Sequence, residues 1–433
     1  MRGDNRRVSR PSARHTTSVS PIAGADGQAV ELLIRFARAA HEAGGYPANE
    51  LEPRISELAQ ALGLPGVQVF VTPTDVELTV GSIPNQQAYM LRVRPRSVDL
   101  HAMGRLDEIA RGVTDGRVNH LQALEEIEKL GQHPLRRPIW LVIAANGLVG
   151  AALAPILGGG WRESLGAAMA GLAVGISAQL IERSERSGAL AAPLGAFVAS
   201  LLASSLAHAG LKIAVRDVTF AGLVVLLPGM TMTVGIGELA TGHLQSGLAN
   251  AANAMVQFVG LVFGVAVGAS LATSWLGPTP VNTPDPLPGI VVIAAAALVG
   301  LAFVVTLRAP ARDAIWMCSA AVLAMVANLV ATEVLGNDIA GVFAAALVVG
   351  LGGHAVAHRY HRSALAFIVP GLLMLVPGGI GFESASSLLA GRTVSGIDAA
   401  FDTFVIMLAI SYGLLVSTLV LPDQLATARH AGR

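Results

Sequence analysis

The sequence predicts an α-helical polytopic membrane protein of about ten transmembrane helices, inverted-repeat-like, with a small α+β cytoplasmic domain at its N-terminus. Of the 433 residues, 53% are hydrophobic and only 13% are charged, about half the charge of an ordinary soluble chain. The charge is also unevenly placed, because residues 1–138 hold 17 Lys or Arg and 16 Asp or Glu whereas residues 139–433 hold only 12 and 13. The longer part therefore lacks the charge to cover itself with a solvated surface, and a purely soluble protein is excluded.

Composition and motifs exclude several further functions. The net charge is zero, so nothing favours nucleic acid as a partner. Cys318 is the single cysteine, which excludes a disulfide scaffold and a cysteine-based metal cluster. The sequence has no Gly-rich phosphate loop, no nucleophile elbow and no HExxH motif. We therefore expect no enzyme activity, no cofactor, no metal site and no ATP-driven transport.

The N-terminal third divides into a tail and a domain. Residues 1–27 are rich in Arg and Ser and lack the apolar stretch of a secretory signal, so we expect a disordered basic tail. Residues 28–138 are expected to form a soluble α+β cytoplasmic domain, whose first helix ends at Gly44-Gly45. The remaining elements expected in this domain are a helix through Leu51–Leu62, strands at 67–71, 76–80 and 88–93, and helices near 103–113 and 118–131.

Apolar segments of about 15–25 residues follow one another from Ile139 onward, and about 20 residues span the hydrocarbon of a bilayer. The expected spans are 139–158, 164–181, 188–208, 217–236, 247–271, 289–307, 314–333, 340–357, 364–381 and 400–421. The fourth and ninth contain Pro and Gly and are the least regular. The spans group into a first membrane module at 139–271 and a second at 289–421. A Pro-rich outer connector at 272–288 joins the modules, and 422–433 is a C-terminal tail.

The basic residues predict the orientation of these spans. If the N-terminus is cytoplasmic, ten arginines flank the inner ends of the spans, whereas the outer loops hold three arginines and one lysine. Lys and Arg are enriched on the cytoplasmic side of membrane proteins. We therefore expect both termini to lie in the cytoplasm.

An internal repeat relates the two modules. A shift of 149 residues places Leu227-Pro228-Gly229 on Val376-Pro377-Gly378, Ser246-Gly247 on Ser395-Gly396, and Gly264 on Gly413. The shift equals five spans, so the two copies are expected to have opposite orientations in the membrane. A weaker likeness, between Gly171–Gly175 and Ala346–Gly350, has an offset near 175 and predicts parallel copies instead. We prefer the 149-residue offset because it rests on Pro, Gly and Ser.

These residues carry a resemblance to a known family. The run Leu226-Leu227-Pro228-Gly229-Met230-Thr231-Met232-Thr233, followed by Glu238-Leu239 and Gly242-His243-Leu244, resembles the signature of the bacterial threonine/serine exporter family. The second copy from Phe367 to Gly378 resembles that family's C-terminal module. In the soluble part, Ala43-Gly44-Gly45-Tyr46-Pro47 and Val69-Phe70-Val71-Thr72-Pro73-Thr74 also fit.

The resemblance covers about residues 28–421 and implies secondary active export of small hydroxy amino acids, threonine and serine, by proton-coupled antiport. It places the chain in the bacterial inner membrane, with protons and the lipid bilayer as its other partners. A facilitator or channel for another small polar solute remains an alternative, as does a membrane-anchored hydrolase or sensor. Whether the chain forms a homo-oligomer is left open.

The interrupted helices are the expected substrate site, because inverted repeats with Pro/Gly breaks at equivalent places typically mark the binding site of a transporter. An unwound backbone offers free carbonyls for the substrate ammonium and a helix N-terminus for its carboxylate. Thr231 and Thr233 would bond the substrate hydroxyl, or alternatively their own helix backbone. The expected substrate-binding residues are Pro228, Gly229, Thr231, Thr233, Asn250, Asn253, Gln257, Pro377 and Gly378.

Four acidic residues are candidates for carrying the coupled proton, because ionisable groups inside a span are costly and usually functional. Asp402 is the first candidate, since it corresponds to Asn253 in the repeat. Asp398 lies one turn earlier and alternatively only caps its helix. Glu238 and Glu383 each follow one of the two Pro-Gly breaks.

Overall fold

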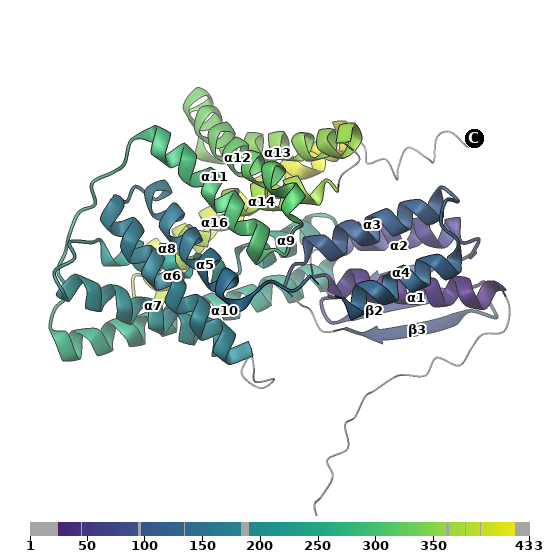
Figure 1. Ribbon diagram of the computed structural model, residues 1–433, viewed down its shortest axis with the longest axis horizontal. Helices are drawn as coiled ribbons and strands as arrows, with labels where there is room; N and C mark the ends of the chain where they lie inside the picture. Colours follow the sequence, from purple (N-terminus) through teal and green to yellow (C-terminus); the bar gives the residue numbers. More distant parts are fainter. Residues whose placement is uncertain are drawn as a thin grey trace, which may run out of the picture.

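The computed structural model separates into a soluble domain at one end and a bundle of long helices at the other (Figure 1). It describes residues 25–44, 46–93, 97–133, 135–182, 190–360, 363–376, 378–389 and 391–420. Most of the expected basic tail and all of the expected C-terminal tail lie outside these ranges, as does Pro377. Gly45 of the expected helix stop also lies outside them.

The soluble domain packs four amphipathic helices on a small antiparallel sheet. The sheet has the order β1-β2-β3, and Val71 pairs with Val76 across its first hairpin. Leu32, Leu33 and Phe36 recur at helical spacing on the first helix and are buried in the core. The elements are α1 (Ala25–Glu42), α2 (Ala48–Ala61), β1 (Gln68–Val71), β2 (Asp75–Val80), β3 (Gln87–Arg92), α3 (Leu100–Thr114) and α4 (His120–Gln132).

Side-chain caps set the starts of the last two helices of this domain. Asp99 accepts a hydrogen bond from the Ala102 N–H at the start of α3, three residues before the expected start. Asn119 and Gln122 form a capping box at the start of α4. The order of helices and strands is the one expected from the sequence, and the two caps account for the observed starts of α3 and α4.

The membrane region contains the expected succession of apolar helices. Among the described residues, nine helices are long and apolar enough to span a bilayer, or ten if one bent pair counts as a single span. The helices are α5 (Ile139–Ile156), α6 (Trp161–Glu182), α7 (Ala191–His208), α8 (Val215–Leu223), α9 (Gly229–Ala240), α10 (Leu244–Leu276), α11 (Gly289–Thr306), α12 (Ala314–Leu335), α13 (Asp338–Tyr360), α14 (Leu365–Leu375), α15 (Gly378–Leu389) and α16 (Thr393–Val420).

The fourth and ninth spans are broken, as their Pro and Gly residues predict. The helical segments Val215–Leu226 and Gly229–Ala240 meet at an angle of 61°, and Leu227 between them has extended backbone angles. In the ninth span, α14 ends at Leu375 and α15 begins at Gly378, with Val376 again extended. Proline has no N–H to continue a helical hydrogen-bond ladder, which explains why the first break falls at Pro228.

The two modules repeat the same packing. In the first, α6 packs against α5, α7 and α8; in the second, α12 packs against α11, α13 and α14. The modules also cross, because α9 packs against α16 and α15 packs against α10. Helices that begin 147 to 153 residues apart therefore occupy equivalent places, and the weaker likeness at 175 residues does not correspond to this packing.

The two helix breaks touch each other where the modules cross. A Cβ built on Gly229 would lie 2.2 Å from Val376 Cγ1, and one built on Gly378 would lie 3.1 Å from Leu227 Cδ1. Gly229 of the first break therefore packs against Val376 of the second, and Gly378 of the second break packs against Leu227 of the first.

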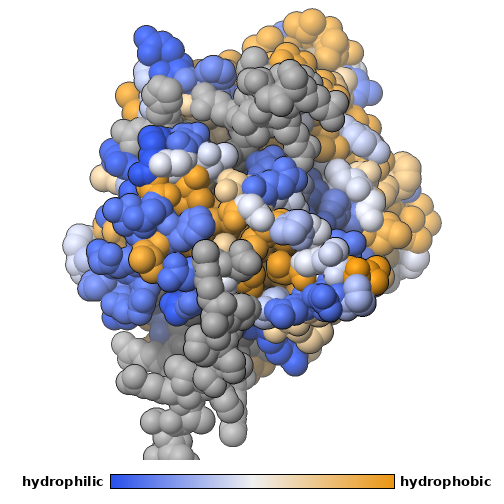
Figure 2. Space-filling model, turned by 90° about the vertical axis from the view of Figure 1, so that its right-hand side faces the viewer, coloured by the Kyte–Doolittle hydropathy of each residue, from blue (hydrophilic) through white to orange (hydrophobic). Residues whose placement is uncertain are grey.

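The soluble domain is firmly joined to one end of the helix bundle. Its apolar core continues into Met317, Leu365 and Val369 of the membrane region. The Leu100 N–H donates to the Leu307 carbonyl at 3.0 Å, and Arg137 Nη2 donates to the Ala309 carbonyl at 2.6 Å. Figure 2 views the molecule from this end and shows hydrophilic residues over much of it, with apolar residues between them and along the upper and right-hand margins.

Candidate functional site

The last turn of α9 carries a buried carboxylate at the junction with the soluble domain. Glu238 on α9 is only 1% exposed. Its Oε1 accepts a hydrogen bond from the Ala48 N–H at 2.8 Å, and its Oε2 accepts one from Asn250 Nδ2 at 2.8 Å. Ala48 is the first residue of α2, and the preceding Pro47 makes no side-chain cap. The carboxylate therefore caps the partially positive N-terminus of α2.

Close backbone packing brings Glu238 and Asn250 together. A Cβ on Gly235 would lie 2.8 Å from the Ala251 nitrogen, and one on Gly247 would lie 2.7 Å from the Gly235 carbonyl oxygen. Only glycines at these two positions let α9 and α10 approach so closely. The acceptor on one helix and the amide donor on the other then meet across the hairpin.

A cavity of about 230 Å³ lies between this hairpin and the soluble domain, and we call it the polar cavity for the polar side chains among its lining residues. The membrane helices contribute Thr231, Val234 and Glu238 at i, i+3 and i+7 on α9, which places them on one helix face. The other lining residues include Ser246, Asn250 and Asn253 on α10, and His41, Tyr46, Ala48, Val71, Thr72 and Pro73 of the soluble domain. Hydroxyl, amide, imidazole and carboxylate groups thus surround one space.

A second cavity, of about 260 Å³, lies beside the first and shares Met230 and Val234 of α9 with it. It is mostly apolar and is lined by α14 and α16 together with Pro47, Asn49 and Glu50 of the soluble domain. Thr233 lines this cavity; its hydroxyl is buried and has no hydrogen-bond partner within the described part of the chain.

The structure brings together four of the residues expected to act in transport. Thr231, Glu238, Asn250 and Asn253 line the polar cavity, whereas Thr233 faces the apolar one. The other expected substrate-binding residues lie elsewhere: Pro228, Gly229 and Gly378 at the crossing of the breaks, Gln257 further along α10 in neither cavity, and Pro377 outside the described residues.

The other three acidic candidates lie away from both cavities. Glu383 on α15 is exposed and pairs with Arg216 at 2.9 Å. Asp398 and Asp402 are exposed on α16 and line neither cavity. Among the four candidates, Glu238 alone is buried beside the polar space.

The contribution of the soluble domain to this cavity was not predicted from the sequence. His41 Nε2 lies 2.7 Å from the Thr72 carbonyl oxygen, and His41 Nδ1 is buried without a partner among the residues described. The sequence did carry a signal for this contribution, because the motifs around Gly44–Pro47 and Val69–Thr74 are part of the family resemblance. They were not predicted to line the site. Both motifs line the polar cavity.

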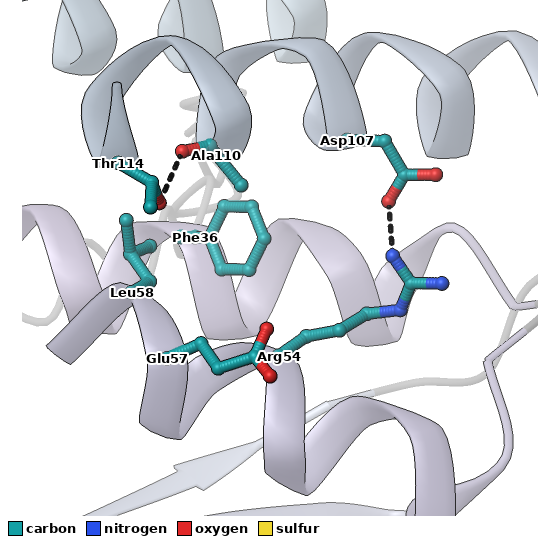
Figure 3. Close-up of a pocket in the computed structure, with 7 residues that line it drawn as sticks. All are labelled: Phe36, Arg54, Glu57, Leu58, Asp107, Ala110 and Thr114. Carbon is teal, nitrogen blue, oxygen red and sulfur yellow. Dashed lines mark hydrogen bonds and ion pairs between the residues drawn. The ribbon is translucent and has the colours of Figure 1, made fainter. Parts of the chain in front are cut away.

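A second polar network holds the start of α2 in place. Asp107 Oδ1 accepts hydrogen bonds from Arg54 Nη1 and from the Tyr46 hydroxyl, both at 2.7 Å. Figure 3 shows Arg54 of α2 and Asp107 of α3, which both line a small pocket, pointing toward each other. Asp107 Oδ2 accepts a bond from Ser363 Oγ at 3.2 Å. Burial, and next the charge of Asp107, raise the pKa of Tyr46 well above its ordinary value.

Two like modules with broken helices that cross at their breaks, beside a polar cavity, define a multi-pass membrane transporter. Within the described residues, no cluster of three or more His, Cys, Asp or Glu side chains is placed to hold a metal ion. A family model described as "Putative threonine/serine exporter" matches residues 31–272, and one described as "Threonine/Serine exporter, ThrE" matches residues 292–420. The chain belongs to the threonine/serine exporter family, a family of transporters and not of enzymes.

Individual relatives agree with this family. A "Probable threonine/serine exporter" of Mycobacterium tuberculosis is 27% identical over 387 residues, covering 85% of this chain and 71% of the relative. A "Threonine/serine exporter" of Corynebacterium glutamicum is 24% identical over 302 residues, covering 68% of this chain and 62% of the relative. An uncharacterized protein of Schizosaccharomyces pombe is 23% identical over 234 residues, covering 52% of this chain and 31% of the relative. No solved structure matches the chain.

Proposed function

We propose that this chain exports threonine and serine across the bacterial inner membrane by proton-coupled antiport, and that Glu238 carries the coupled proton. The names of the family models and of two relatives support the substrate. The observation that carries the coupling is the burial of Glu238 beside a polar cavity, between an amide donor and a helix N-terminus.

The substrate groups find complementary partners around this carboxylate. A threonine or serine zwitterion has an ammonium, a carboxylate and a hydroxyl. Glu238 would accept from the ammonium, Asn250 and Asn253 would donate to the carboxylate through their amides, and Thr231 would bond the hydroxyl. These four side chains come from two helices that are joined by a short turn, so they would move as one unit.

Coupling follows from the cost of an unpaired charge. An ionised carboxylate inside a membrane protein is costly unless a cation or a proton neutralises it. The site would therefore change its accessible side only when Glu238 holds either the substrate ammonium or a proton. Because the two compete for one carboxylate, outward movement of the amino acid would be tied to inward movement of one proton.

Transport by purified protein in proteoliposomes tests this mechanism. For one-to-one exchange, a gradient of one pH unit supports at most about tenfold accumulation of labelled threonine. We expect Glu238→Gln to keep counterflow of threonine but to lose accumulation driven by the gradient. Glu383→Gln, at an exposed acid on α15, is the matched control and should accumulate like the parent. Gradient-driven accumulation by Glu238→Gln would refute the coupling role, and absence of counterflow for every small amino acid in the parent would refute the exporter.

The orientation is part of the same proposal. Hydrogen bonds place the turns that follow α9, α11 and α13 at the soluble-domain end, through Glu238, Leu307 and Ser363. These turns follow the fourth, sixth and eighth spans. With ten spans and both termini in the cytoplasm, the turns after even-numbered spans lie on the cytoplasmic side. Reporter fusions at positions 135 and 280 should report cytoplasm and periplasm respectively, and the reverse result would contradict this orientation.

A further inference from the structure

We propose that the N-terminal soluble domain is the inner gate of the transport path, latched shut by the N-terminus of α2 on Glu238. This inference rests on the proposed function in one respect only, namely that the polar cavity is the path of the substrate. The latch itself is a structural contact between residues 190 positions apart in the sequence.

The latch has two points, both on α2. At the first, the Ala48 N–H donates to Glu238 Oε1. At the second, one turn later, Glu52 Oε2 lies 3.3 Å from Nε2 of His243, in the turn between α9 and α10. Glu52 Oε1 also accepts a bond from the Val71 N–H at 2.9 Å, which connects this point to the sheet. The soluble domain is thus fixed to the hairpin that carries the proposed site.

The domain also forms a wall of both cavities. Its residues from α1, from the start of α2 and from the β1–β2 turn line the polar cavity. Pro47, Asn49 and Glu50 line the neighbouring apolar cavity. The N-terminus of α2 therefore lies against the end of α9 and forms part of the wall of both cavities. A solute that enters from this end would pass between α9 and this wall.

A second set of contacts attaches the domain to the other module. Asp99 and Leu100, at the start of α3, contact the turn between α11 and α12: Leu100 bonds the Leu307 carbonyl, and Asp99 Oδ2 lies 3.9 Å from Arg308 Nη1. Asp107 of α3 bonds Ser363 between α13 and α14. The domain therefore bridges the modules, with α2 on the first and α3 on the second. Movement of one module against the other would pull α2 away from Glu238 while α3 stays attached.

The substrate and the latch would compete for the same atoms. When the domain is docked, each oxygen of the Glu238 carboxylate accepts one hydrogen bond, Oε1 from the Ala48 N–H and Oε2 from Asn250. A substrate ammonium that bonds this carboxylate would replace the Ala48 N–H. Loading of the site would thereby release the gate, and departure of the substrate would allow α2 to return.

Cysteine accessibility tests the gate without measuring transport. In a Cys318→Ala background, Thr231→Cys places one thiol in the polar cavity, and a membrane-impermeant maleimide is added from the soluble-domain side. Ala48→Pro removes the latch N–H at the first position of α2, where proline fits a helix. Pro47 already has the extended backbone angles that a following proline requires. We expect the thiol at position 231 to be labelled at least about tenfold faster with Ala48→Pro than without it, because the lost hydrogen bond is to a charged group.

Three further variants make the result decisive. His120→Pro makes the same substitution at the first position of α4 and should label at the parent rate. Glu238→Gln keeps an oxygen that accepts from Ala48, so it should also label at the parent rate even though it abolishes coupling. Glu238→Ala removes the acceptor from the membrane side and should label as fast as Ala48→Pro.

The outcomes separate the gate from the proposed function. Parent-rate labelling of both Ala48→Pro and Glu238→Ala would overturn the gate. If Ala48→Pro fails to fold, the rate of Glu238→Ala alone decides. A parent protein that moves no threonine, while the labelling pattern is as expected, would refute the exporter and leave the gate standing.

Discussion

The crossing of the two helix breaks makes a quantitative prediction about Gly229. In Gly229→Ala the new Cβ would lie 2.2 Å from Val376 Cγ1 and 3.8 Å from the Gly378 Cα. An ordinary carbon–carbon contact is about 3.5 Å, so the two atoms must separate by roughly 1.3 Å. Val376 is β-branched and precedes a proline, so neither its side chain nor its backbone moves easily. We expect the substitution to destabilise the protein by about 1–3 kcal/mol, as overpacking usually does.

A double-mutant cycle with Val376→Ala tests this explanation. The smaller residue removes Cγ1, so the methyl group added at position 229 can occupy the vacated space. We expect the double variant to recover most of the stability that Gly229→Ala loses, with a coupling of about 1–2 kcal/mol between the two positions. The stability of all four proteins is compared by thermal melting in the same detergent, together with threonine counterflow in proteoliposomes.

The control for this cycle is Gly289→Ala at the start of α11, where no atom lies within 4 Å of the added Cβ. This variant should melt at the parent temperature. Simple additivity of the Gly229→Ala and Val376→Ala effects would show that the two breaks do not touch, and would refute the crossing on which the packing of the modules depends.

Three other predictions concern single residues. Pro228→Ala restores a backbone N–H and should lower export more than membrane abundance; unchanged export at normal abundance would contradict a role for the break. Asp402→Asn should keep uphill export, because Asp402 is exposed away from both cavities; loss of uphill export, with a milder effect of Asp398→Asn, would favour Asp402 as the coupling acid. Burial and Asp107 raise the pKa of Tyr46 above its unfolded value of about 10, so its contribution to stability should be present below pH 10 and lost as pH rises through the folded pKa. Between pH 8 and pH 11, the melting temperature should therefore fall more steeply with pH for the parent than for Tyr46→Phe.

The sequence was sufficient for the architecture because hydropathy and helix breakers are local signals. The spans from Ile139 onward follow from the length of their apolar runs. The break at Pro228 follows from the missing N–H of proline. The 149-residue repeat predicts the equivalence of α9 with α15 and of α10 with α16, because Pro and Gly are retained at corresponding positions.

The composition of the site was harder to predict, because it depends on contacts between distant segments. Nothing near Glu238 in the sequence indicates that its partner is the Ala48 N–H of the soluble domain. Thr231 and Thr233 are two positions apart on a helix, about 200° around its axis, and they line different cavities. By the same rule, Thr231 and Glu238 are seven positions apart and share a face, which the structure places in the polar cavity.

The crossed packing of the modules also sets the order of events during biosynthesis. α9 packs against α16, yet roughly 150 residues separate Ala240 from Thr393, so at ordinary rates of synthesis the ribosome needs about 8–30 s to make the intervening chain. During that interval α9, which carries the Glu238 carboxylate, has no contact with α16. Two partners are ready much earlier, because Ala48 has already been synthesised and Asn250 follows within a dozen residues. The residues that pair with Glu238 in the complete structure are thus all synthesised before the second half of the transporter.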